Sequence, residues 1–216
     1  MTLFNRNFSR KALSIIVFAL LLTNTLWLMG EIKPVEASPA LTLKWVRWIG
    51  PYSTTVAPLA ADLLPSRPGL EIVLTGGPGD WSSTGAVTVL DGRDGSTVWQ
   101  RTPADIPNIG IDAHTPVEIA DLNKDGVLEI VISSLTGPLV LRGNDGSVYW
   151  RNMAASAGNV YPVVYDIDGD GYPEVYVTNI LGPVYGYDYI TRLSYDGKIL
   201  NQAWCWHSCW GGLSIG

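Results

Sequence analysis

Histidine and cysteine are scarce in this sequence, and their scarcity narrows the chemistry open to it. The 216 residues include two of each. Zinc sites and imidazole catalysis depend on these residues, so neither is predicted here. His114, in "GIDAHTPVE", is a candidate general base, but a lone loop histidine is more often structural, and no nucleophile lies at a matching spacing. The role of Glu118, inside the apolar segment that follows, stays equally open.

Basic residues are also few. The net charge is −6. Residues 1–37 hold four of the basic and two of the acidic residues, so the remainder carries ten basic and eighteen acidic residues, a net charge of −8. Such a surface repels phosphate backbones, and we expect no nucleic acid among its partners.

Only one long hydrophobic run is present, from Ala12 to Met29, behind a basic stretch. Together with the small-residue stretch Val35-Glu36-Ala37 it is typical of a helical signal peptide that is removed after cleavage. Its length also suits an uncleaved membrane anchor. In both cases residues 38–216 are exported, so the sequence predicts a secreted or cell-surface protein whose only membrane contact is through residues 1–37.

Helical periodicity is absent after this run, and a repeat takes its place. Asp-Gly pairs begin at Asp94, Asp145 and Asp196, a spacing of 51 residues. Each pair lies between two short apolar segments, a setting in which Asp-Gly predicts a β-hairpin. The second segment of each hairpin ends near a tryptophan, namely Trp99, Trp150 or Trp204.

Two more strands are expected on either side of an acidic loop in the later repeats. They are "TPVEIA" (115–120) with "LEIVIS" (128–133), and "YPVVY" (161–165) with "PEVYV" (173–177). Four short antiparallel strands in about fifty residues predict a blade of a β-propeller. A β-sandwich of hairpins is the alternative, and the regular spacing argues against it. The fold predicted is all-β, a partial β-propeller with blades near 56–103, 115–151 and 160–204.

Two fragments flank these blades. Residues 41–49, "LTLKWVRWI", are expected to form a lone ring-closing strand in which Trp45 or Trp48 replaces a blade tryptophan. Residues 211–216 match the start of a further blade. Because closed propellers have four to eight blades, we expect the chain to be part of a longer protein whose remaining blades are its partners.

Two loops crowd acidic side chains at alternating positions. The first acidic loop, "DLNKDGVLE" (121–129), and the second acidic loop, "DIDGDGYPE" (166–174), share oxygen-bearing side chains at positions 1, 3 and 5, Gly at 6 and Glu at 9. Alternating oxygens on a tightly coiled loop converge on one point, and hard oxygens suit Ca²⁺. The predicted ligands are Asp121, Asn123, Asp125, the carbonyl of Val127 and Glu129, and Asp166, Asp168, Asp170, the carbonyl of Tyr172 and Glu174.

The loops differ from an EF-hand because the closing Glu comes at position 9 and a strand follows. The alternative is a plain turn held by Asx hydrogen bonds, like the three Asp-Gly turns. The corresponding loop of the first blade, 62–71, keeps Asp62 and Glu71 but lacks the middle acids and contains Arg67. We expect no metal there, with Arg67 neutralising the remaining acids.

The segments "ADLNKDGVLEIVI" and "YDIDGDGYPEVYV" resemble FG-GAP repeats, the integrin-α-like or VCBS-type repeats of calcium-bearing propellers. The stretch 71–92, with its Gly76-Gly77-Pro78 turn, is similar to the same family, and the "DGS-V-W" hairpins resemble quinoprotein-type repeats. The resemblance covers about 56–204. It implies that the acidic side chains of both loops hold metal beside the first hairpin of each blade.

The end of the chain, "WCWHSCWGG" (204–212), contains both cysteines. Cys205 and Cys209 favour a local disulfide in an exported protein, although the ring is tight, and free thiols are the alternative. We expect Trp204 to lie in the core. Trp206 and Trp210 form either an exposed aromatic platform or a surface covered by a further blade.

Two classes of function fit these features. The first is a non-catalytic calcium-stabilised propeller that binds extracellular glycans or proteins, as in cell adhesion. The second is a fragment of a secreted propeller enzyme, a polysaccharide lyase or a quinoprotein-like oxidoreductase, with its active site in other blades. The sequence contains metal loops and scaffold but no recognisable reaction centre, which favours the first.

Overall fold

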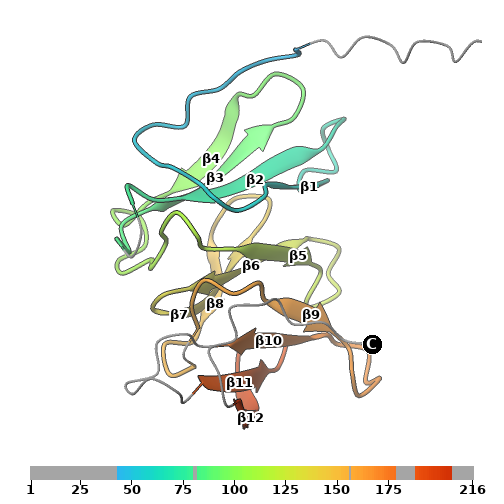
Figure 1. Cartoon of the computed structure of the whole chain (residues 1–216). Coiled ribbons are helices and arrows are strands. Elements are labelled where there is room, and N and C mark those ends of the chain that lie inside the picture. The colour runs from blue at the N-terminus through green and yellow to red at the C-terminus, as the bar shows by residue number, and fades with distance from the viewer. Residues whose placement is uncertain (1–42, 80–81, 156, 179–187, 206–216) are drawn as a thin grey trace, which may run out of the picture. The chain divides into compact units, whose positions relative to one another are not determined.

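The computed structural model describes residues 43–79, 82–155, 157–178 and 188–205 (Figure 1). The hydrophobic run at 12–29, the fragment at 211–216 and the aromatic residues Trp206 and Trp210 lie outside them. The chain divides into two units after Leu43, and the strands of the described residues belong to the second unit. The described residues contain no helix long and apolar enough to span a membrane.

Three four-stranded antiparallel sheets, each built from four consecutive strands, make up the described chain (Figure 1). The first sheet contains β1 (Leu59–Ala61), β2 (Glu71–Gly76), β3 (Ala86–Asp91) and β4 (Thr97–Arg101). The second contains β5 (Val117–Ala120), β6 (Glu129–Ser134), β7 (Gly137–Arg142) and β8 (Val148–Arg151). The third contains β9 (Val163–Tyr165), β10 (Glu174–Thr178), β11 (Asp188–Leu193) and β12 (Ile199–Cys205). The prediction of an all-β partial propeller is confirmed.

The middle strands are buried on both faces. All six residues of β3 ("AVTVLD") and of β6 ("EIVISS") are buried. Successive side chains of a strand point to opposite faces of the sheet, so both faces of these two strands are covered. One apolar cluster contains residues of the first two sheets, including Val89 and Leu139, and another contains Val140 and Val175 of the second and third.

The Asp-Gly hairpins form as predicted. Their glycines adopt positive φ angles of 72°, 69° and 82° at Gly95, Gly146 and Gly197. This conformation is inexpensive only for glycine. In the first two turns the aspartate also caps the backbone two residues on, as Asp94 Oδ1 accepts the N–H of Ser96 at 2.8 Å.

Each of these glycines also receives a tryptophan ring from the preceding segment of chain. A methyl group on the glycine would lie less than 3 Å from an indole atom: 2.6 Å for Trp45 on Gly95, 2.8 Å for Trp99 on Gly146 and 2.6 Å for Trp150 on Gly197. Two separate features therefore require glycine at these positions: the positive φ angle and the close approach of the tryptophan ring.

The indole N–H of the same tryptophans completes the contact. It donates to a backbone carbonyl of the next sheet, at 3.1 Å from Trp45 to Gly92, 2.9 Å from Trp99 to Gly143 and 2.8 Å from Trp150 to Tyr195. A buried indole N–H needs such a partner. Neighbouring sheets are thus joined by one repeated apolar and polar contact.

Two expectations about tryptophans need correction. Residues 43–49 form no strand, in contrast to the strand expected at 41–49. The Trp45 ring nevertheless packs on the turn glycine of the first sheet, as Trp99 and Trp150 pack on those of the second and third sheets. Trp204 was expected in the core, but 60 % of it is exposed. It lies on β12, the edge strand of the last described sheet. No described sheet follows whose turn glycine could pack against its ring.

Candidate metal-binding loops

The two acidic loops occupy equivalent positions in their sheets. The first acidic loop joins β5 to β6, and the second joins β9 to β10. In both loops the closing glutamate is also the first residue of the strand that follows, as is Glu71 in the first sheet. The position of each closing carboxylate is therefore fixed by the strand ladder.

The closing glutamates share one backbone contact. One oxygen, Oε2, accepts the N–H of the residue after the first aspartate: Leu122 for Glu129 at 2.9 Å, Ile167 for Glu174 at 3.1 Å and Leu63 for Glu71 at 2.9 Å. This bond pins the start of the loop to its end. It uses one oxygen of each carboxylate and leaves the other, Oε1, for a different partner.

The first acidic loop is coiled by its own side chains. Asp121 Oδ2 accepts the N–H of Gly126 at 3.0 Å, and Asp125 Oδ1 accepts the N–H of Val127 at 2.8 Å. Asn123 Oδ1 accepts the N–H of Asp125 at 3.0 Å. Gly126, with φ of 85°, provides the sharp turn that this layout needs.

Two carboxylate oxygens of the first acidic loop are buried without a hydrogen-bond partner. They are Asp121 Oδ1 and Glu129 Oε1, and Glu129 is 0 % exposed. Burial raises the pKa of Glu129 to about 7, and the nearby charges of Asp125 and Asp121 add to the rise. An unpaired buried carboxylate is costly, so the loop favours a bound positive charge.

The second acidic loop is coiled in the same way. Asp166 accepts the N–H groups of Gly169 at 2.8 Å and of Gly171 at 2.9 Å. Asp170 Oδ1 accepts the N–H of Tyr172 at 2.8 Å. The shared layout in the sequence thus produces a shared backbone path.

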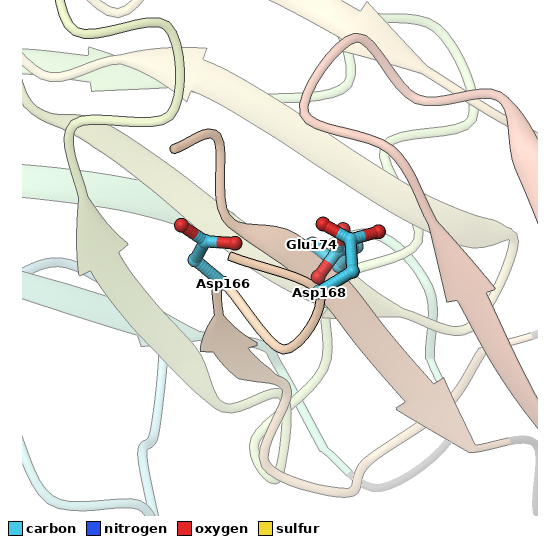
Figure 2. Close-up of side chains that lie close together, drawn as sticks. All are labelled: Asp166, Asp168 and Glu174. Atoms are coloured by element: carbon cyan, nitrogen blue, oxygen red, sulfur yellow. The ribbon is translucent and has the colours of Figure 1, made fainter. Parts of the chain in front are cut away.

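Three acidic side chains of the second acidic loop converge. Figure 2 shows Asp166, Asp168 and Glu174, whose carboxylate oxygens include one set lying within 4.8 Å of one another. Asp170 is not part of this group, and the acids of the first acidic loop form no such group in the described chain. The structure therefore brings together three of the five predicted ligands of this loop.

An arginine lies on the converging acids. Arg192 Nη2, from β11, contacts Asp168 Oδ2 at 2.5 Å and Glu174 Oε1 at 2.7 Å. The hydrogen bond to Glu174, and then that to Asp168, raises the pKa of Arg192, and the same guanidinium lowers the pKa of Asp168. The Oε1 that is unpaired in the first acidic loop thus has a cationic partner in the second.

Two arginines neutralise an acidic residue of the first sheet, but this residue is Asp91, whereas Arg67 was expected to neutralise Asp62 and Glu71. Arg67 Nη2 lies 2.5 Å and Arg93 Nη2 2.6 Å from Asp91 Oδ2. Asp91 pairs with Glu71 across β2 and β3. The hydrogen bonds from Arg93 hold the pKa of Asp91 far below its usual range. Arg67 therefore neutralises an acid on the opposite strand, which the loop sequence does not reveal.

The two acidic loops are neighbours in space. Lys124 of the first loop places its Nζ 5.8 Å from the centre of the Tyr172 ring in the second. Tyr172 in turn stacks on Tyr195, with ring centroids 4.6 Å apart. Both loops therefore belong to the same edge of the assembled sheets.

The other candidate residues lie elsewhere. The backbone N–H of His114 donates to Asp112 Oδ1 at 2.8 Å, and the fully buried Asp112 also accepts from Asn159 Nδ2 at 3.0 Å. Glu118 lies within β5, half-buried, opposite Val131. Asp112 thus ties together the segments that precede β5 and β9, a structural role that the sequence did not predict.

No family model matches this chain, and no curated protein matches its sequence. Solved structures do match its fold. The match to BamB from Moraxella catarrhalis has a TM-score of 0.39 and 15 % identity, and covers 69 % of this chain and 51 % of that one. The match to quinohemoprotein alcohol dehydrogenase ADHIIG from Pseudomonas putida HK5 has a TM-score of 0.46 and 15 % identity, covering 71 % and 28 %.

A third match is the V. cholerae biofilm matrix protein Bap1, with a TM-score of 0.31, 18 % identity and coverage of 75 % of this chain and 42 % of that one. This chain spans about half of these proteins or less. At such identities the likeness concerns the fold alone.

Proposed function

We propose that this chain is part of an exported, non-catalytic β-propeller of the FG-GAP-like kind, which binds calcium in its acidic loops and presents its surface to extracellular proteins or glycans. The observation that carries the calcium proposal is the buried Glu129 Oε1, which has no hydrogen-bond partner. A carboxylate oxygen in that state lowers its free energy by facing a cation.

The residues fit a hard divalent ion. In the first acidic loop Asp121 Oδ1 and Glu129 Oε1 are the available carboxylate oxygens, and Asn123, Asp125 and the Val127 carbonyl complete the proposed ligand set. In the second, the set is Asp166, Asp168, Asp170, the Tyr172 carbonyl and Glu174. Oxygens that already accept one N–H keep a second lone pair for a cation. Sets made only of oxygen select calcium over zinc.

Calcium at these loops would act on stability. The ion would neutralise the crowded carboxylates and bind only the coiled form of each loop, so mass action would favour the folded protein. Since the closing glutamate begins a strand, the effect would reach the sheet beside the loop. This is the role of a scaffold ion, with no chemical step assigned to it.

The surface proposal rests on exposed aromatic side chains. At the end of β9 Tyr165 is 53 % exposed, and Tyr161 before this strand and Tyr172 in the second acidic loop are exposed as well. Tyrosine combines an apolar ring with a polar end, which suits stacking on sugars and contact with protein side chains. Binding to a panel of immobilised polysaccharides, compared between the unchanged chain and Tyr165→Ala, tests this part; equal binding by both would count against it.

The calcium proposal is tested by thermal unfolding of the full chain with EGTA and with about 1 mM calcium, a level relevant to extracellular modules. Calcium should raise the Tm of the unchanged chain and should raise it less in Glu129→Gln. Asp145→Asn is the matched control, because it removes a carboxylate from a plain Asp-Gly turn and should leave the calcium effect intact. A Tm that is the same in EGTA and in calcium would refute the proposal.

A further inference from the structure

Arg192 stands at a position that is apolar in the other two sheets. The residue after each closing glutamate pairs with a leucine of the next strand: Ile72 with Leu90, Ile130 with Leu141 and Val175 with Leu193. The residues just before these leucines are therefore equivalent, and they are Val89, Val140 and Arg192. Both valines are fully buried in apolar clusters. An arginine at this position thus departs from the repeat.

The guanidinium occupies the oxygens that a cation would use. Arg192 Nη2 lies 2.5 Å from Asp168 Oδ2 and 2.7 Å from Glu174 Oε1, and these two carboxylates belong to the group that converges in Figure 2. The same oxygen of the other acidic loop, Glu129 Oε1, is unpaired. The guanidinium and an ion cannot both take Oδ2 and Oε1 at these distances, so they compete.

Arg192 does not use all of its hydrogen-bond donors in this contact. Its Nε is buried and has no acceptor, and the side chain is about one-fifth exposed. Hydrogen bonds between charged groups are stronger than those between neutral groups, and an ion must replace two of them. Near the first acidic loop, Arg142 instead places its guanidinium 5.0 Å from the centre of the Tyr149 ring. The competition is therefore specific to the third sheet.

We propose that Arg192 is an internal competitor for the cation of the second acidic loop. This loop therefore binds calcium more weakly than the first, and it exchanges guanidinium for calcium only at higher calcium concentrations. The inference rests on the proposed calcium binding and adds a graded response to it: the first acidic loop takes up the ion first and the second responds later. Arg192 sets this order without being a ligand.

The test is a calorimetric calcium titration of the full chain carrying Glu129→Gln. In this variant the measured heat should come from calcium binding at the second acidic loop alone. Arg192→Met should bind calcium at least about tenfold more tightly, because the ion no longer displaces two charged hydrogen bonds. Arg192→Lys should fall between, since an ammonium is a single point charge without the planar fork. Arg142→Met is the matched control and should leave this affinity unchanged.

A second readout separates competition from a purely structural role. In EGTA, Arg192→Met should melt below the parent, because Asp168 and Glu174 lose their shared partner, and calcium should reverse the order of the two melting temperatures. A purely structural arginine predicts a lower Tm in both conditions. If Arg192→Met does not fold, Arg192→Lys decides the question by its affinity alone.

The failures of the two proposals can be told apart. If Arg192→Met and Arg192→Lys bind calcium no more tightly than the parent, Arg192 is not a competitor, whatever the first acidic loop does. If calcium leaves the chain with an intact first acidic loop unaffected but binds when Arg192 is replaced, the competitor inference stands and the calcium role of the first loop fails. Binding to neither loop in any variant overturns both.

Discussion

Replacing Glu129 by glutamine removes the charge of a completely buried carboxylate while keeping the length of the side chain. The glutamine oxygen can still accept the N–H of Leu122, which Glu129 Oε2 now accepts at 2.9 Å. The new amide nitrogen takes the unpaired position of Oε1. Its burial costs about 1–3 kcal/mol, and this cost does not depend on pH.

The charge effect does depend on pH. The pKa of Glu129 is about 7 in the folded protein against its usual value of 4.5, so the folded state holds the proton more tightly than the unfolded state. The contribution of Glu129 to the stability of the calcium-free protein is therefore greatest below pH 4.5, and it is lost as the pH rises through about 7. At 1.36 kcal/mol per pH unit, the loss between about pH 5 and about pH 8 is at most about 2.5 kcal/mol.

Urea unfolding in EGTA, followed by tryptophan fluorescence at several pH values, measures this effect. Relative to the unchanged chain, Glu129→Gln should gain about 2 kcal/mol of unfolding free energy from about pH 5 to about pH 8. Asp145→Asn, a charge removal in a plain Asp-Gly turn, is the control: hydrogen bonds from Ser147 lower the pKa of Asp145, so this variant should show no comparable trend over the same pH range. Parallel pH curves for Glu129→Gln and the unchanged chain would refute the argument from burial.

Three further predictions address other parts of the fold. Gly146→Ala should lower stability by about 2 kcal/mol or more in chemical unfolding, since it strains a positive φ and places a methyl group 2.8 Å from the Trp99 ring; wild-type stability would show that the ring moves freely. Asp168→Ala should abolish the calcium response of the second acidic loop and leave that of the first, as measured by calorimetry; loss of both responses would contradict independent loops. Asp91→Asn should remove an acid-labile contribution: because the pKa of Asp91 is held far below its usual range by Arg93, its stabilisation is present above about pH 4 and is lost as pH falls below it. Melting temperatures of Asp91→Asn and the unchanged chain should therefore differ most above about pH 4 and converge at lower pH, and a constant difference would argue against the ion pair.

The features that the sequence predicts well are local ones. The Asp-Gly turns and the coiling of the acidic loops depend on residues within about ten positions of one another, and the four-strand unit depends on strands that follow one another directly in the chain; all appear in the structure. The 51-residue spacing supplied the number of sheets. Periodic, local signals of this kind survive folding because each strand and turn is fixed mainly by its own neighbours.

The features that the sequence missed cross between strands or sheets. Arg192 reaches Asp168 across 24 positions, and Arg67 reaches Asp91 across the same number. Both contacts depend on which residues face each other across a ladder. The seats of Trp99 and Trp150 lie in the next sheet, about one repeat further along the chain. The tryptophans were visible in the sequence, but the glycines that receive them were assigned only to turns.

The tryptophan contacts run in one direction along the chain. Trp45, Trp99 and Trp150 each reach forward to a glycine of the following sheet, and none reaches back. Neighbouring described sheets are therefore joined by the same tryptophan–glycine contact, and each repeat contributes one tryptophan ring and one turn glycine. Gain or loss of one whole repeat would leave all remaining junctions matched. Such a chain can change its number of sheets by duplication or deletion without any compensating substitution at the junctions, which is how nearest-neighbour arrays come to vary in length.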